Sequence, residues 1–200
     1  MDSIAYNRIL EPKGMKEPIS DLFQLSFGDS EGAEEGKSIG LLSRDLIEKT
    51  PTGDIYVFVA TTNKIPADDT VCSSTKIVGC IMFTRIIFSD DPQTTAYLLS
   101  PVAVHSAHQG KGIGQGLITF GLDALRSSTP HNVDIVVTYG DPKYYSKVGF
   151  QPVTTDYIPA PFPLSQPQGW QAQSLLIGHT IKKITGTSTC VAAFDKPELW

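Results

Sequence analysis

The stretch that decides the fold is LLSPVAVHSAHQGKGIGQGLITF, residues 98–120. Its beginning belongs to a run over residues 97–105 that is apolar on both alternating faces, the pattern of a strand in the middle of a covered sheet. Pro101 interrupts this strand. Because proline has no backbone N–H to donate, we expect the strand to lose a hydrogen bond there and the pairing of the sheet to break.

A glycine-rich loop and a helix follow this strand. Glycine occupies every second position of residues 110–116. One helical stripe of apolar residues comes next, formed by Ile113, Leu117, Phe120, Ala124 and Leu125. A loop whose backbone N–H groups converge at a helix start favours anions, because unpaired amides and the helix dipole act together. The alternative is a turn that needs glycine only for its positive φ angles.

The glycine spacing argues against two common phosphate loops. A P-loop needs a glycine five residues before Gly-Lys-Ser/Thr, but His105 stands five residues before Gly110, and Gly112 follows Lys111. The dinucleotide fingerprint needs glycines at offsets 0, 2 and 5, and its third position falls on Gln115 or Leu117. A plain nucleotide-binding domain is therefore disfavoured.

Periodicity predicts the other elements of the chain. The expected strands are residues 4–9, 54–61, 76–88, 133–139, 174–181 (SLLIGHTI) and 190–194 (CVAAF). A helix pair is expected over 18–27 and 39–47, joined by the polar tract DSEGAEEGKS at 29–38, and residues 63–75 are expected to form a polar hairpin loop. A helix of about two turns is expected over 142–148, with Asp141 as N-cap and Gly149 as its left-handed end.

Composition narrows the class of protein. The chain has 200 residues, 40% of them hydrophobic, and a net charge of −5. This suits one domain over residues 1–200 and disfavours a nucleic-acid partner, since no basic run exceeds Lys182-Lys183. Neither a secretory h-region nor an apolar run of membrane-spanning length is present, so we expect a cytoplasmic protein without a membrane partner. Three scattered cysteines, Cys72, Cys80 and Cys190, are expected to be reduced and packed.

The loop also resembles a known motif. Gln109, two residues, Gly112, one residue and Gly114 are similar to the acyl-CoA pyrophosphate loop of the GCN5-related N-acetyltransferase (GNAT) superfamily, with its signature Gln or Arg, x, x, Gly, x, Gly or Ala. LLSPVAVH resembles the central bulged strand of that family, and YYSKVGF, residues 144–150, resembles its short helix ending in Gly-Phe. The GDP before YY looks most like a bacterial subgroup of predicted N-acetyltransferases of uncertain substrate.

The resemblance implies an α/β fold, with a central mixed β-sheet splayed at a bulged strand and flanked by helices. It implies acetyl-CoA as co-substrate. The pyrophosphate would be held at Gln109 and by the amides of the loop and helix start, namely Gly110, Lys111, Gly112, Ile113, Gly114 and Gln115. The pantetheine arm would pair with the main chain of Val102, Ala103 and Val104, with a freed amide polarising the thioester carbonyl.

Acetyl transfer also needs an acid for the departing thiolate and a base for the amine. By resemblance Tyr145 is the acid; the alternative for Tyr145 is an aromatic residue packed beneath the cofactor. Tyr144 points about 100° away on the helix and is interpreted as structural, and Phe150 is expected in the core. The central strand has no carboxylate. Candidate bases are Asp29, Glu34 and Glu35 in the loop of the helix pair, although an acidic run usually only faces water.

Two predictions remain, one on a metal site at a pair of histidines and one on the function of the protein. His105 and His108 have metal-ligand spacing but no third ligand nearby, so we expect no metal. The predicted function is an acetyl-CoA-dependent N-acetyltransferase that transfers the acetyl group directly to a primary amine of a small molecule, amino acid or peptide. The alternative is a non-catalytic acyl-CoA-binding or sensing domain. A monomer or a homodimer is expected.

Overall fold

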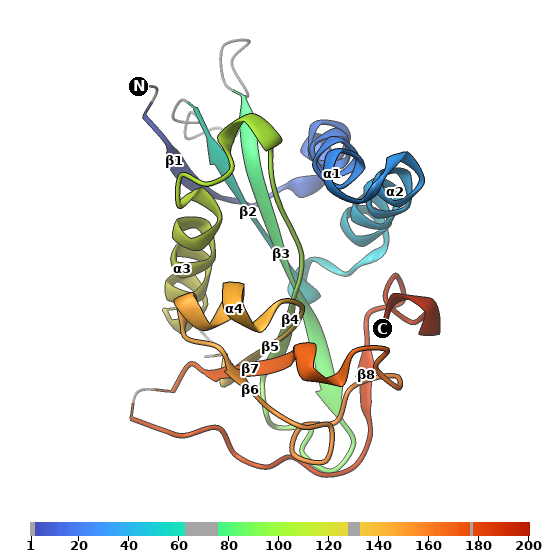
Figure 1. Cartoon of the computed structure of the whole chain (residues 1–200). Helices are drawn as coiled ribbons and strands as arrows, with labels where there is room; N and C mark the ends of the chain where they lie inside the picture. Colours follow the sequence, from blue (N-terminus) through green and yellow to red (C-terminus); the bar gives the residue numbers. More distant parts are fainter. Residues whose placement is uncertain (1–2, 63–75, 128–132, 177) are drawn as a thin grey trace. The chain divides into compact units, whose positions relative to one another are not determined.

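The computed structural model describes residues 3–62, 76–127, 133–176 and 178–200 (Figure 1). Among them, eight strands form one mixed sheet in the order β1-β2-β3-β4-β5-β7-β6, with β8 paired to β3. The strands are β1 (Ala5–Ile9), β2 (Ile55–Thr61), β3 (Ile77–Phe88), β4 (Ala96–Val104), β5 (Ile135–Tyr139), β6 (Gln151–Pro152), β7 (Trp170–Ser174) and β8 (Ser188–Cys190). The helices are α1 (Lys16–Glu31), α2 (Ala33–Lys49), α3 (Ile113–Arg126) and α4 (Pro142–Tyr145). The predicted α/β class is confirmed.

The chain divides into two compact units. The first unit contains Met1–Met82 and Pro101–Gly121, and the second contains Phe83–Ser100 and Leu122–Trp200. The division therefore runs through β3 and through β4, and in β4 it falls at Pro101. The expectation of a single domain over residues 1–200 stays a prediction.

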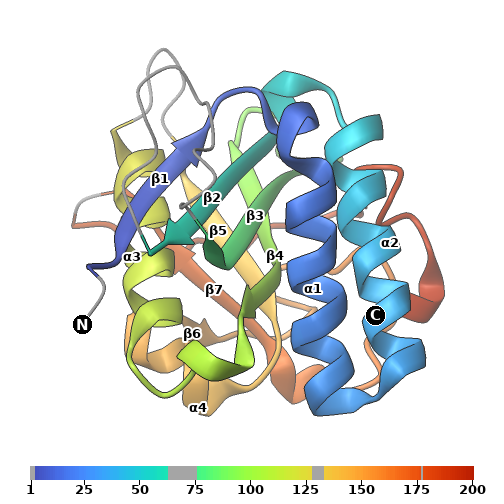
Figure 2. The same ribbon diagram turned by 90° about the horizontal axis from the view of Figure 1, so that it is seen from above.

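In the first unit, helices lie on both sides of the strands. β1 pairs antiparallel with β2, α3 lies on one side of them, and α1 and α2 lie on the other (Figures 1 and 2). On the α3 side, the ring of Phe120 lies 5.9 Å from the ring centroids of both Tyr6 and Phe58. On the other side Phe23 of α1 and Leu46 of α2 are fully buried. On the α3 side, these ring contacts attach the helix that follows the glycine loop to β1 and β2.

The polar tract expected as a loop is helical, so that prediction is wrong. α1 continues to Glu31 and α2 begins at Ala33, leaving only Gly32, at φ 102°, between them. Glutamates near a helix N-terminus are favoured by the dipole, as at Glu34 and Glu35 of α2. The helices also approach closely, because a Cβ at Gly36 would lie 2.4 Å from the carbonyl oxygen of Gln24. Gly32 thus forms the turn between the two helices, and Gly36 lets them pack closely.

In the second unit, β4 and β5 form a short parallel ladder. It runs from Ala96 paired with Ile135 to Leu99 paired with Thr138 and ends there, while β4 continues to Val104. The ladder is reinforced by the Thr138 hydroxyl, which donates to the carbonyl of Leu99 over 3.0 Å. The ladder stops just before Pro101, where the sequence predicted that the pairing of the sheet breaks.

The C-terminal strands differ from those predicted. β5 pairs antiparallel with β7, β6 pairs with β7, and β8 pairs with β3. The run expected as a strand at 174–181 contributes only Ser174, and the run at 190–194 contributes only Cys190. β7 was missed because its sequence WQAQS is polar, although Gln171 is fully buried and donates to two backbone carbonyls. The other predicted elements match within a few residues; the loop at 63–75 and Cys72 lie outside the described residues.

Two observations bear on the predictions from composition. In the part of the chain that the structure describes, no helix is long and apolar enough to cross a membrane. Cys80 is buried and Cys190 half-buried, and both are free thiols. Burial is the largest cause that raises the pKa of the Cys190 thiol to about 11, followed by the nearby Asp195 carboxylate.

Candidate functional site

The end of β4 in the first unit carries three predicted cofactor-binding residues. Ala103 is buried, whereas Val102 and Val104 are half-buried. The amide of His105 donates to the carbonyl of Val78 on β3 over 2.9 Å. Backbone groups of neighbouring strand residues face opposite edges, so those of Val102 and Val104 face away from β3. This is the edge along which an extended ligand could pair with the main chain.

The carbonyl of Val104 is already used within the protein. It accepts one hydrogen bond from the hydroxyl of Ser26 on α1 and one from the side-chain amide of Gln109, each over 2.9 Å. A carbonyl oxygen has two lone pairs, so both acceptor positions are taken. A ligand that pairs with the main chain of Val104 would therefore have to accept a hydrogen bond from its N–H. Gln109, predicted to contact the cofactor, uses its side chain to hold the start of its own loop.

The glycine loop has the conformation that its sequence predicts. Gly110 has φ 72° and Gly112 has φ 77°, both in the left-handed region that favours glycine. A Cβ placed at either residue would meet no atom within 4 Å. Packing against the chain therefore does not demand glycine here. The backbone angles do, and the loop surface is open to a ligand.

The first turn of α3 provides the unpaired amides expected of an anion site. The amide of Gly116 donates to the carbonyl of Gly112 over 2.9 Å, which is the first bond of the helix. The amides of Ile113, Gly114 and Gln115 precede this bond and have no partner within the helix by geometry. Together with the positive end of the helix dipole they can bind an anion. The ammonium of Lys111 donates to the carbonyl of Ala107 over 2.8 Å.

The histidine pair has a structural contact in the loop. Nδ1 of His105 accepts a hydrogen bond from the amide of Ala107 over 3.2 Å, capping the short 3-10 turn Ser106–His108. The rings of His105 and His108 lie edge to face, 5.9 Å apart. One imidazole nitrogen of His105 is thus occupied in shaping the turn before the loop.

Tyr145, the predicted acid, lies on α4 in the second unit. Asp141 caps this helix as expected, its carboxylate accepting from the amide of Lys143 over 2.9 Å. A 3-10 turn over Ser146–Val148 continues the helix, and Gly149 ends it at φ 94°. The predicted segment of about two turns, with its N-cap and its left-handed end, is confirmed.

The surroundings of Tyr145 keep its phenol protonated. Burial, the largest cause, raises the pKa of Tyr145 to about 12; a hydrogen bond with Thr138 lowers this pKa and the neighbouring Tyr144 raises it. Its ring lies edge to face with those of Phe150, at 5.8 Å, and Tyr144, at 5.1 Å. Phe150 is buried, as predicted for the core. A phenol with this pKa carries its proton at neutral pH, as a proton donor must, but the raised pKa makes it a weaker acid toward a thiolate than an ordinary tyrosine.

The three candidate bases lie on helices, not in a loop. Asp29 is in the last turn of α1, and Glu34 and Glu35 are in the first turn of α2. All three are exposed. Their exposure fits both interpretations of these residues, a base for the amine or an acidic run that only faces water.

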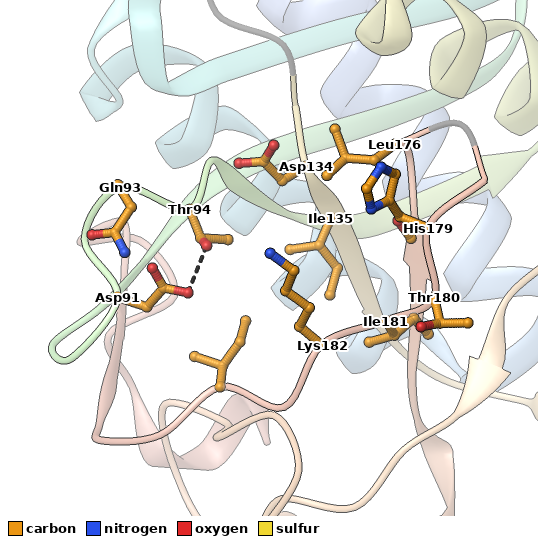
Figure 3. A pocket seen from close by; sticks show the side chains of 12 residues that line it. Asp91, Gln93, Thr94, Asp134, Ile135, Leu176, His179, Thr180, Ile181 and Lys182 are labelled. Carbon is orange, nitrogen blue, oxygen red and sulfur yellow. Dashed lines mark hydrogen bonds between the residues drawn. The ribbon is translucent and has the colours of Figure 1, made fainter.

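A separate pocket of about 270 Å³ lies within the second unit (Figure 3). Asp91, Asp134, His179 and Lys182 are among the side chains that line it. The Asp91 carboxylate accepts from the hydroxyl of Thr94, and that of Asp134 accepts from the amide of Thr95, each over 2.7 Å. None of the catalytic or cofactor-binding residues predicted from the sequence lines this pocket. Its two carboxylates already accept hydrogen bonds from Thr94 and Thr95.

A family model matches half of the chain. The family described as "Acetyltransferase (GNAT) domain" matches residues 53–152, which include β4, the glycine loop, α3 and α4. Over 114 residues the chain is 36% identical to "Uncharacterized N-acetyltransferase YjhQ" of Escherichia coli strain K12, covering 52% of this chain and 61% of that protein. Over 77 residues it is 31% identical to "Uncharacterized N-acetyltransferase YhbS" of the same strain, covering 38% and 43%. The chain thus spans less than two thirds of these relatives.

Solved structures show the same fold over nearly the whole chain. The structure of YhbS from Escherichia coli in complex with CoA superposes with a TM-score of 0.66 at 21% identity, covering 97% of this chain and 92% of that one. A GNAT family acetyltransferase from Brucella melitensis in complex with acetyl-CoA gives a TM-score of 0.64 at 21% identity, covering 98% and 100%. With the family match across β4, the loop and α4, the chain belongs to the GNAT acetyltransferase family.

Proposed function

We propose that this protein is an acetyl-CoA-dependent N-acetyltransferase that transfers the acetyl group directly to a primary amine. The observation that carries the proposal is the loop after β4. Gly110 and Gly112 adopt left-handed angles and face open space, and the unpaired amides of Ile113, Gly114 and Gln115 follow at the helix start. These are the groups that a pyrophosphate needs.

The binding of acetyl-CoA is supported by the two solved relatives, one with CoA and one with acetyl-CoA. In this chain the pyrophosphate would contact Gln109 and the amides from Gly110 to Gln115. The pantetheine arm would run along the outer edge of β4 at Val102, Ala103 and Val104, extending the sheet where the ladder to β5 has ended. At Val104 the arm would use the N–H, because Ser26 and Gln109 take the carbonyl.

The chemistry divides among three groups. The neutral amine nitrogen attacks the thioester carbonyl, the C–S bond breaks, and the thiolate takes a proton. A main-chain N–H of β4 would stabilise the charge that develops on the carbonyl oxygen. Tyr145 would supply the proton for the thiolate; its phenol is protonated at neutral pH, although its raised pKa makes it a weaker acid than an ordinary tyrosine. The proton of the amine would leave to water or to Asp29, Glu34 or Glu35, directly or through water.

The acceptor would be a small molecule, an amino acid or a peptide. The sequence GDPKYY, residues 140–145, resembles the motif of the bacterial subgroup of uncertain substrate, and we propose that the chain belongs to this subgroup. We propose further that the protein acts as a monomer or homodimer in the cytoplasm and uses neither a metal nor a nucleic-acid partner.

The test measures release of free CoA from acetyl-CoA over a panel of polyamines, aminoglycosides, amino acids and peptides with free N-termini. Amine-dependent release above the rate of hydrolysis is the expected result. Stabilisation by acetyl-CoA without release over the whole panel would contradict the proposal.

A second function, a non-catalytic acyl-CoA-binding or sensing domain, is favoured by one observation. β4, with the sequence AYLLSPVAV, carries no carboxylate that could act as a base. Such a domain would bind acetyl-CoA but release no CoA with any amine, and Tyr145→Phe would leave acetyl-CoA binding unchanged. The turnover experiment therefore separates the two functions.

A further inference from the structure

Ser26 connects α1 with the strand that leads into the glycine loop. Its hydroxyl donates to the carbonyl of Val104 over 2.9 Å, although the two residues are 78 positions apart. A buried helical serine commonly bonds back to a carbonyl of its own helix, one turn earlier. Ser30 on the same helix does this, donating to the carbonyl of Ser26 over 3.2 Å. The Ser26 hydroxyl is directed out of the helix to β4.

Burial makes the Ser26 bond the more durable of the two at Val104. Ser26 is 6% exposed, whereas Gln109, the other donor, is exposed. An exposed amide exchanges its partner with water at little cost, whereas the hydroxyl of the buried Ser26 has little access to water if its bond to the half-buried Val104 breaks. Ser26 therefore holds the Val104 peptide when Gln109 is engaged elsewhere, as by a ligand.

The position of Val104 determines where the loop begins. The turn that follows is held by bonds within it: the amide of His108 donates to the carbonyl of His105 over 2.8 Å, and the amide of Gln109 donates to that of Ser106 over 3.2 Å. Such a turn moves as one piece with the peptide to which it is attached. Fixing that peptide holds the backbone near the arrangement that binds an anion, and preorganisation of this kind raises affinity.

We propose that Ser26 is a positioning residue for the CoA-binding loop, acting through the carbonyl of Val104 and touching no substrate itself. This inference rests on the proposed function, since it takes CoA pyrophosphate as the ligand of the loop. It assigns α1 a task besides packing: the helix anchors the start of the cofactor site.

The experiment compares Ser26→Ala with Ser20→Ala. Ser20 is also buried on α1 and donates to a carbonyl of another element, that of Gly40 on α2, over 2.8 Å. Both variants lose one hydrogen bond donated by a buried serine and should lose similar thermal stability. Titration calorimetry with CoA should show about three- to tenfold weaker binding for Ser26→Ala and unchanged binding for Ser20→Ala.

Pantetheine separates positioning of the loop from a general loss of structure. It lacks the pyrophosphate and would pair only with β4, including the N–H of Val104, so Ser26→Ala should weaken pantetheine binding less than it weakens CoA binding. In turnover, KM for acetyl-CoA should rise and kcat should stay within about twofold. Ser26→Thr keeps the hydroxyl and should restore CoA affinity. Should Ser26→Ala not fold, Ser26→Cys, whose thiol is a weak donor, takes its place with the same expected results.

The outcomes distinguish this inference from the function on which it rests. A parent protein that binds no CoA overturns both. A parent that binds CoA, with Ser26→Ala binding it equally well, overturns the positioning role and leaves the proposed function standing. Equal weakening in Ser26→Ala and Ser20→Ala, or equal loss for CoA and pantetheine, would reduce Ser26 to a packing residue.

Discussion

The ring of Tyr145 lies directly against the backbone of Gly140, so that a Cβ at Gly140 would be 2.7 Å from Cε2 of the ring. Gly140 follows the last residue of β5, and its amide donates to the carbonyl of Gly169 over 3.0 Å. The turn after β5 has no room for a side chain on the side of the tyrosine. The position of the phenol is therefore set by backbone.

Replacement of Gly140 tests whether this contact matters for the chemistry. Gly140→Ala must displace the Tyr145 ring, and a small misplacement of a catalytic group costs rate. We expect turnover to fall at least about tenfold, with acetyl-CoA affinity little changed. Gly14→Ala, where a Cβ would meet nothing within 4 Å, is the matched control and should keep full activity. Unchanged turnover in Gly140→Ala would show that the ring position is not critical.

Tyr145→Phe keeps the ring packing against Gly140 and Phe150 and removes only the hydroxyl. If the phenol protonates the thiolate, turnover falls on the order of 100- to 10,000-fold while acetyl-CoA affinity changes little. Steady-state kinetics with an amine identified in the panel measure this. Tyr144→Phe is the control and should do much less. Equal turnover of the two variants would remove the acid role from Tyr145.

An aspartate in the loop should abolish cofactor binding. Gly112→Asp places a negative charge where the pyrophosphate is expected and strains a residue at φ 77°. Gly178, at φ 74° and also with nothing within 4 Å of a Cβ, lies outside the loop, so Gly178→Asp carries the same strain. A ligand that binds only the native state raises its melting temperature. Acetyl-CoA should stabilise Gly178→Asp as it stabilises the parent, and should not stabilise Gly112→Asp.

The raised pKa of Tyr145 predicts a loss of stability at alkaline pH. The phenol ionises near pH 10 in the unfolded chain and near pH 12 in the folded one. The stabilisation is complete below pH 10 and is lost as pH rises through 12, because only the unfolded state releases its proton in this window. Between about pH 9 and about pH 11.5 the parent should lose about 2 kcal/mol more free energy of unfolding than Tyr145→Phe. Urea denaturation measures the difference; parallel curves would contradict the assignment.

The close approach of α1 and α2 predicts a stability effect at Gly36. Its Cβ would lie 2.4 Å from the Gln24 carbonyl oxygen and 2.7 Å from the Gly28 nitrogen, both of them backbone atoms that cannot turn aside. Gly36→Ala should cost about 1–3 kcal/mol by overpacking. In contrast, Gly28→Ala meets nothing within 4 Å and should stabilise α1 by about 0.5–1 kcal/mol. Thermal and urea unfolding measure both changes in the free energy of unfolding. If the helix contact were unimportant, the two changes would have the same sign.

Several elements could be predicted from the sequence because their causes are local. The left-handed angles at Gly110 and Gly112, the cap at Asp141 and the end at Gly149 each depend on a residue and its close neighbours in the chain. The apolar strands and the stripe of α3 follow from periodicity for the same reason. The ladder between β4 and β5 ends at Leu99, just before Pro101, where the sequence predicted a break in pairing.

Other features depended on contacts between distant segments. The tract at 29–38 is helical because α1 and α2 pack together, and β7 is a strand because β5 and β6 offer partners to a polar sequence. At the candidate site, the sequence by itself determined that a glycine loop precedes α3 and that the first amides of this helix have no partner within it. Only the tertiary structure decided that Ser26 bonds to Val104 and that Tyr145 lies on Gly140. A hydrogen bond across 78 positions leaves no periodic signal, since it arises from packing and not from neighbours along the chain.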